Sequence, residues 1–281
     1  MTKATSWTCP SCAQTVDTAF CARCGEQPPA PRELTLAGLA EKLVDSFTSI
    51  DARALRSARL LLRRPGELTV AWIRGVRKPY VAPFQLFLIA NVIFFALQSL
   101  TGVIVFSSPL ESHLHHQDWS ALAQGLLARH LAASGIPFEQ YAPVFDQAVV
   151  VNGKSLILLM TVPFTLALPL LFVRARRPFM THVVFSLHVY AFLLLLFCAT
   201  MLGGKASSLL GFGGLEVPAV DNVLSVVNLT GCMLYLYFAI GPVYRTTGPT
   251  RIAQAVVLAI AAGAIVLGYR FLLFVVTLYG T

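Results

Sequence analysis

The sequence predicts an all-α integral membrane helical bundle of about five spans, preceded by a small cysteine-bearing head and juxtamembrane amphipathic helices. Apolar residues make up 56% of the chain, charged residues only 12%, and the mean hydropathy is +0.71. These values lie outside the usual range of a soluble globular domain. The other two observations are several long uncharged runs and a polar N-terminal segment that carries paired cysteines.

The N-terminal segment, residues 1–27, contains two Cys-x-x-Cys pairs. Their members are Cys9, Cys12, Cys21 and Cys24. Zinc prefers four ligands in a tetrahedron, and two thiolates on one tight turn supply half of such a set. The spacing therefore predicts a short zinc ribbon. Its Zn²⁺ would be structural, because four protein thiolates leave no open coordination position.

The same cysteines could instead form disulfides or a redox-active Cys-x-x-Cys. A cytoplasmic location disfavours disulfides, because cytosolic thiols are kept reduced. A thioredoxin-like site would need a surrounding strand and helix pattern that this segment lacks. The zinc interpretation is therefore favoured.

Residues 28–80 are expected to form a linker and basic amphipathic helices. Apolar residues recur at spacings of three and four between Leu36 and Ile50, which predicts one helix, and Asp51 can cap a second. A basic helix directly before a span suits the anionic headgroup layer, where each Lys or Arg contributes roughly 1 kcal/mol. The residues expected at the membrane surface are Arg53, Arg56, Arg59, Arg63, Arg64, Arg74, Arg77 and Lys78. The alternative is that these helices pack on each other and present a solvated basic face.

The transmembrane bundle is expected over residues 81–281. About 20 mostly apolar residues, at ~1.5 Å rise each, cross a hydrocarbon core of about 30 Å. The runs that meet this criterion lie at about 81–106, 155–173, 180–202, 222–244 and 252–279.

The distribution of basic residues predicts the orientation of the bundle. Most of the 21 Lys and Arg residues lie before the first span or in the short turns at 174–177 and 245–251. Basic residues that flank spans mark the cytoplasmic face. Five spans then place the N-terminus in the cytoplasm and the C-terminus in the periplasm. The net charge of +8 is interpreted as orientation and contact with anionic lipid, and no nucleic-acid partner is expected.

Three ionisable residues inside the expected spans form a candidate intramembrane polar site: His182, His188 and Arg270. Ionisable groups at membrane depth are functional candidates by default. At ~1.5 Å per residue, His188 would lie near the midplane. A neutral imidazole hydrogen-bonded across helices is the favoured alternative for His188, and Arg270 is close enough to the outer end to extend toward the interface.

A second histidine group, His113, His115 and His116, lies between the first two spans. Imidazoles this close in sequence could capture zinc or copper. Because no further ligand stands at a defined spacing, a solvated loop is the favoured interpretation.

The first ninety residues carry a recognisable order of motifs. The two cysteine pairs are followed by Leu61-Leu-Arg-Arg-Pro-Gly66 and Gly75-Val-Arg-Lys-Pro-Tyr80, with Pro83 at the first span. This order resembles, over about residues 9–90, an uncharacterised bacterial family of multi-spanning membrane proteins with an N-terminal zinc ribbon, known as a domain of unknown function. The resemblance implies the bacterial inner membrane and supplies no activity.

Three functions are compatible with these features. The favoured one is a non-enzymatic multi-pass membrane protein whose ribbon and basic helices interact with anionic lipid or a cytoplasmic protein. The alternatives are a small-solute or ion transporter that uses the polar span residues, and a membrane enzyme acting on a lipid-linked substrate. No hydrolase, P-loop, metalloprotease or dinucleotide motif occurs in the sequence, so we assign no catalytic residue. No feature of the sequence indicates an oligomeric state.

Overall fold

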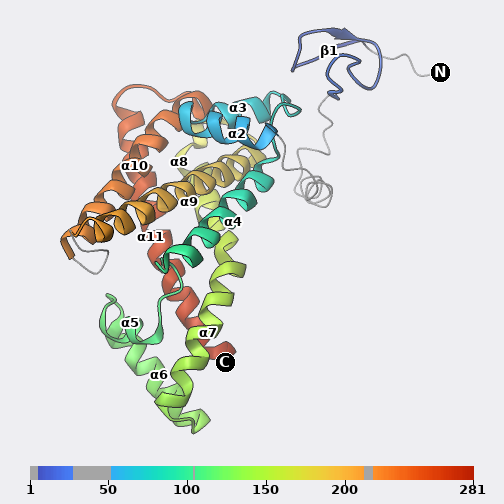
Figure 1. The fold of residues 1–281 in the computed structure, drawn as a ribbon. Helices are drawn as coiled ribbons and strands as arrows, with labels where there is room; N and C mark the ends of the chain where they lie inside the picture. The colour runs from blue at the N-terminus through green and yellow to red at the C-terminus, as the bar shows by residue number, and fades with distance from the viewer. Residues whose placement is uncertain (1–5, 28–51, 104, 212–217) are drawn as a thin grey trace. The chain divides into compact units, whose positions relative to one another are not determined.

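A computed structural model describes residues 6–27, 52–103, 105–211 and 218–281 (Figure 1). The helix predicted between Leu36 and Ile50 and the cap at Asp51 lie outside the described residues. Within them the fold is helical apart from one small hairpin, which confirms the predicted class. The strands are β1 Trp7–Thr8 and β2 Thr15–Val16, and the helices are α2 Ala52–Arg63, α3 Glu67–Ile73, α4 Pro83–Thr101, α5 Leu110–His115, α6 Ser120–Ser134, α7 Phe138–Leu156, α8 Thr161–Leu171, α9 Phe179–Leu209, α10 Pro218–Tyr244 and α11 Gly248–Gly280.

The helices are grouped into two compact units. The first contains the described residues up to Phe94 together with Thr165–Ala259, and the second contains Phe95–Phe164 and Ile260–Thr281. The first unit therefore holds the N-terminal head, α2, α3, α9 and α10. The second holds α5, α6, α7 and the end of α11.

The head is built on the β1–β2 hairpin. The two strands are antiparallel, with Trp7 opposite Val16. Its buried core consists of Cys9, Val16 and Cys21, against which Trp7 packs. So small a core excludes little apolar surface from water, and the head therefore depends on a further stabilising interaction.

The hairpin of α2 and α3 packs onto the helices of the first unit. α3 contacts both α9 and α10, and α2 contacts α9. Trp72 of α3 forms a buried cluster with Met180 and Val184 of α9. The buried hydroxyl of Ser57 on α2 donates to the carbonyl of Arg53 at 2.8 Å and accepts from the N–H of Val81 at 3.0 Å. α2 is thereby attached to the chain that enters α4.

Among the described residues, four helices are long and apolar enough to cross a membrane: α4, α9, the Asn222–Tyr244 part of α10, and α11. A fifth candidate is the pair Phe138–Lys154 and Ile157–Leu171, which is bent by 58° at a short break. The break lies between Lys154 and Ile157, and a 3-10 turn, Ile157–Met160, follows it before α8 begins.

α9 and α11 are longer than a bilayer requires. α9 has 31 residues and α11 has 33, so each is roughly 45–50 Å long at ~1.5 Å per residue, against a hydrocarbon core of about 30 Å. Each helix must therefore either tilt in the bilayer or extend beyond the hydrocarbon core into the headgroup layer.

The second unit has its own aromatic core. Phe106 packs edge-on against Tyr269, and Phe145 lies against Phe274. The hydroxyl of Tyr269 on α11 donates to the carbonyl of Gly153 on α7 at 2.8 Å. α7 and the end of α11 are thereby joined by both apolar and polar contacts.

Candidate metal centre and basic surface segment

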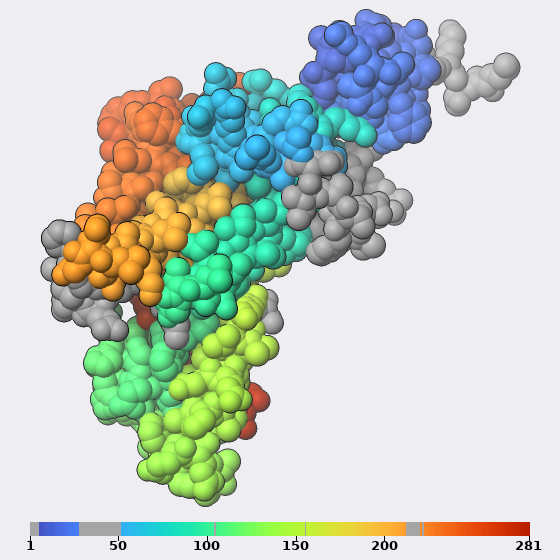
Figure 2. Space-filling model, viewed as in Figure 1, coloured from blue at the N-terminus to red at the C-terminus, as the bar shows by residue number. Residues whose placement is uncertain are grey.

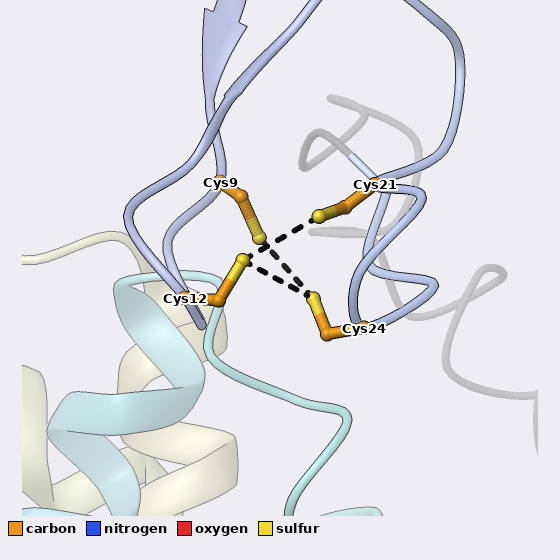
Figure 3. Close-up of side chains that lie close together, drawn as sticks. All are labelled: Cys9, Cys12, Cys21 and Cys24. Carbon is orange, nitrogen blue, oxygen red and sulfur yellow. Dashed lines mark hydrogen bonds between the residues drawn. The ribbon is translucent and has the colours of Figure 1, made fainter.

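The four N-terminal cysteines converge on one point, as Figure 3 shows. The Sγ–Sγ distances are 3.4 Å for Cys9–Cys24, 3.4 Å for Cys12–Cys21 and 3.8 Å for Cys12–Cys24. All four Sγ atoms lie within 4.8 Å of one another. These distances are far longer than the roughly 2.05 Å of a disulfide, and the four thiols are free. The cluster can therefore hold one metal ion.

Two backbone turns of the same design present the thiols. In the first, the N–H of Ala13 donates to the carbonyl of Cys9, and in the second the N–H of Gly25 donates to the carbonyl of Cys21. Ala13 has φ 59° and Gly25 has φ 71°, so both turns close in the left-handed region. Glycine adopts that region without steric cost, whereas alanine is strained there.

The thiols influence one another's ionisation. Burial acts to raise the pKa of Cys21, but hydrogen bonds from the backbone of Cys24 and Arg23 lower it to about 7. A backbone hydrogen bond from Glu26 acts to lower the pKa of Cys24, but burial and the neighbouring cysteines raise it to about 12. Once one thiolate forms, a second beside it is disfavoured. A bound cation removes this penalty and allows all four to ionise.

Glu26 immediately follows the second turn and is the residue that sequence reasoning missed. Its side chain is only 5% exposed. Its Oε2 accepts hydrogen bonds from the Ser11 hydroxyl at 2.6 Å and from the backbone N–H groups of Arg77 at 3.3 Å and Lys78 at 3.1 Å. The head is therefore connected to the turn that leads into α4. Sequence alone shows only an acidic residue after Gly25, which would not reveal partners about fifty positions away.

The basic residues named from the sequence differ in their surroundings. Six of them are exposed: Arg56, Arg59, Arg63, Arg64, Arg74 and Lys78. Arg53 is partly buried, and the guanidinium of Arg77 lies 4.6 Å from the centre of the Trp72 ring. Arg77 is thus a packing residue of the hairpin as well as a surface charge.

The exposed face of α2 combines arginines with leucines. Leu55 is 75% exposed and Leu62 is 50% exposed, and with Arg59 they recur at helical spacing on one side. Ser57 and Leu61 are buried on the opposite side. Figure 2 shows α2, in light blue, uncovered on the face in view.

The polar residues of the expected spans do not form one described site. His182 Nδ1 is hydrogen-bonded to the Tyr244 hydroxyl at 2.9 Å, and His188 Nδ1 to the Thr69 hydroxyl at 2.8 Å. Both histidines belong to the first unit, whereas Arg270 belongs to the second and donates to the Ser108 hydroxyl at 2.9 Å.

The partner of His188 changes the interpretation of that residue. Thr69 lies on α3, a helix of seven residues that is too short to cross a membrane. His188 therefore binds the juxtamembrane hairpin and not another span. The interhelical hydrogen bond that the sequence analysis favoured for His188 is therefore present. Its partner helix is α3, whose contact with α9 the sequence pattern does not predict.

The second histidine group does not converge either. His113 is fully buried, accepts a hydrogen bond from Trp119 Nε1 at 3.3 Å and lies 5.0 Å from the Phe274 ring. Burial, together with the charge of Arg270, lowers the pKa of His113 to about 4. His115 is exposed and pairs with Glu111 at 3.3 Å. Within the described ranges, the N-terminal cysteines are the group that gathers three or more metal-ligating side chains.

Together the fold and the cluster define a multi-span helical membrane protein with four cysteines that can hold a metal ion. Residues 51–95 match the model of a family described as "Protein of unknown function (DUF3667)". The match covers α2, α3 and the first part of α4, and the cysteine cluster lies outside it. No curated protein and no solved structure matches the chain.

Proposed function

We propose that this protein is a non-enzymatic multi-pass membrane protein whose zinc-bearing head and basic hairpin contact anionic lipid headgroups at the cytoplasmic face. The observation that carries the proposal is the exposed side of α2. It presents Leu55 and Leu62 among Arg56, Arg59 and Arg63. The hairpin packs through the other side of α2, so this face is available to a partner.

The chemistry of the face matches a lipid headgroup layer. An amphipathic helix lies in this layer with its apolar residues at the acyl boundary and its basic residues at the phosphates. Each arginine near anionic lipid contributes roughly 1 kcal/mol, and a fully buried leucine contributes about 1.5–3 kcal/mol. Two leucines and three arginines are therefore enough to hold α2 against a membrane to which the protein is already anchored.

Zinc is the metal that the cysteine cluster suits best. A Zn–S bond of about 2.3 Å in a tetrahedron separates neighbouring sulfurs by about 3.8 Å. The distances of 3.4–3.8 Å between the cysteine Sγ atoms are close to this value. Four thiolates close the coordination sphere, so the ion would stabilise the head and perform no chemistry.

The basic turns support five spans and a cytoplasmic N-terminus. If the bent pair of α7 and α8 crosses the bilayer, the turns at 174–177 and 245–251 lie on the same side as the basic hairpin. If the pair enters and leaves on one side, both turns fall on the opposite face, against the preference of basic residues for the cytoplasm. We therefore place the C-terminus outside, and the resemblance to a bacterial family supports the inner membrane.

Transport has less support. His182 and His188 each satisfy a neighbouring hydroxyl within the packed first unit. Polar side chains that pair across helices commonly join the bundle.

The test is hydrogen exchange on the full-length protein in lipid nanodiscs. One preparation contains only phosphatidylcholine and the other contains phosphatidylglycerol as well. We expect the backbone amides of α2 to exchange more slowly in the anionic discs, and this protection to weaken at high salt because surface charges are then screened. Replacing Arg56, Arg59 and Arg63 together by glutamine should abolish the difference between the two lipids.

The control is Arg129→Gln, which removes an exposed arginine from α6. This variant should retain the lipid-dependent protection of α2. Equal exchange of α2 in the two kinds of disc would contradict the proposal.

A further inference from the structure

The turn before α4 is held by a side chain of the head. The N–H groups of Arg77 and Lys78 are consecutive, and both donate to one oxygen, Oε2 of Glu26. The Glu26 side chain is almost completely buried. A buried carboxylate is stable only when its hydrogen bonds are made, so these contacts are integral to the fold of this region.

The position of Glu26 depends on the two cysteine turns. The N–H of Cys21 donates to the backbone carbonyl of Glu26 at 2.8 Å. Ser11, the third donor to Oε2, lies between Cys9 and Cys12. The Cys21 N–H and the Ser11 hydroxyl, which position Glu26, thus both belong to the turns that present the thiols. Small domains held by four thiolates generally lose their fold without the ion.

The turn before α4 also contacts helices α2 and α3. Val81, directly after the turn, donates to Ser57 on α2. Arg77 lies over the ring of Trp72, which packs against Met180 of α9. A change at the turn can therefore reach both the lipid-facing helix α2 and the bundle.

We propose that Glu26 is a metal-dependent latch between the cysteine centre and the turn of residues 74–80. With the ion bound, the carboxylate holds the N–H groups of Arg77 and Lys78. Without it, the cysteine turns loosen, the carboxylate withdraws, and the basic turn becomes accessible. This inference rests on the proposed metal centre and adds a means by which its occupancy regulates the membrane-proximal segment.

The test measures hydrogen exchange at the amides of Arg77 and Lys78 in the full-length protein, in phosphatidylcholine nanodiscs, together with its zinc content. Loss of hydrogen bonds to a buried carboxylate should accelerate exchange at these two amides by about tenfold or more. We expect this acceleration after chelation of the wild-type protein. We also expect it in Glu26→Ala while the variant still binds zinc, because Glu26 is not a ligand.

Asp17→Ala is the matched control, since Asp17 is an exposed acidic residue of the same head. It should leave both the zinc content and the two amides unchanged. Unchanged exchange in zinc-loaded Glu26→Ala would overturn the latch while leaving the metal centre intact. Amides that stay protected after complete chelation would overturn the dependence on metal, as would wild-type protein that binds no zinc.

Discussion

Gly66 lies directly against the backbone of Ala239. A Cβ at position 66 would clash with the Ala239 carbonyl oxygen and would lie 2.9 Å from Cγ of Pro242. Gly66 also has φ +85°, a conformation that other residues rarely adopt. The glycine of the Arg-Pro-Gly element thus allows the α2–α3 hairpin to contact α10, which gives this part of the matched family region a physical role.

Gly66→Ala should strongly destabilise the first unit. Strain in the left-handed region costs about 1–2 kcal/mol, and the clash with backbone atoms adds more, so we expect a total of about 3 kcal/mol or more. Thermal unfolding of the purified protein in detergent measures the effect. Gly102→Ala is the control, because Gly102 has φ +71° with no neighbour within 4 Å. Equal losses in the two variants would show that the approach to Ala239 contributes nothing.

The effects of substitutions at Arg251 and Gly241 on thermal stability should not be additive. Pro242 has no N–H to donate to the Phe238 carbonyl, and Arg251 donates to that carbonyl at 3.2 Å and to the Tyr237 carbonyl at 2.6 Å. A Cβ at Gly241 would lie 2.6 Å from the guanidinium carbon. Gly241→Ala should therefore lower the melting temperature in the wild type.

In an Arg251→Ala background the same substitution should be nearly neutral, because the clashing group is absent. A double-mutant cycle on thermal stability measures the coupling, which we expect to be about 1–2 kcal/mol. Additive effects would contradict the packing that we describe.

Metal analysis should find one zinc ion per chain. Cys12→Ser should reduce the zinc content to near zero, because a serine hydroxyl is a poor replacement for a thiolate. Cys198 and Cys232 are free and buried in α9 and α10, so the double variant Cys198→Ser, Cys232→Ser should keep its zinc. Zinc retained in Cys12→Ser would exclude the four-thiolate centre.

The second unit should lose stability in mild acid through His113. The pKa of His113 is lowered to about 4 by burial, with a contribution from Arg270, whereas the unfolded chain has a histidine pKa of about 6.5. The buried neutral imidazole of His113 makes its full contribution to the free energy of unfolding above pH 6.5. This contribution falls as the pH drops from about 6.5 to 4, because the unfolded state then binds a proton that the folded state does not.

Unfolding between pH 7 and 4 measures this loss, which should be on the order of 3 kcal/mol. His113→Phe should have a weaker pH dependence in this range. His116→Phe, at an exposed position, should behave like the wild type. An unchanged profile in His113→Phe would assign the acid sensitivity to other groups.

Reporter fusions at the two ends should place them on opposite sides of the membrane. This result is expected because five crossings put every basic turn on the cytoplasmic side. A reporter active only in the cytoplasm, fused in turn to each terminus, distinguishes the possibilities. Activity at both ends would mean that the bent pair of α7 and α8 is re-entrant and that four helices cross.

The cysteine cluster could be predicted from sequence because its determinants are local. The two Cys-x-x-Cys pairs lie close together in the chain, and a short hairpin is enough to bring Cys9 near Cys24. The apolar runs likewise identify α4, α9, α10 and α11, because the length needed to cross a bilayer is a property of consecutive residues. The break between Lys154 and Ile157 is less predictable, because an apolar run does not indicate where its helix bends.

The roles of Glu26, Gly66 and His188 were decided by the tertiary structure. Each acts through a partner far away in sequence: the turn before α4 for Glu26, Ala239 for Gly66, and Thr69 for His188. Periodicity and spacing describe which residues share a face of one helix, but not which two helices meet. By itself the sequence determined a cysteine cluster and a set of apolar helices. The packing of α2 and α3 on α9 and α10 determined which polar side chains became buried partners and which arginines stayed on the surface, because burial depends on the atoms that the fold brings alongside.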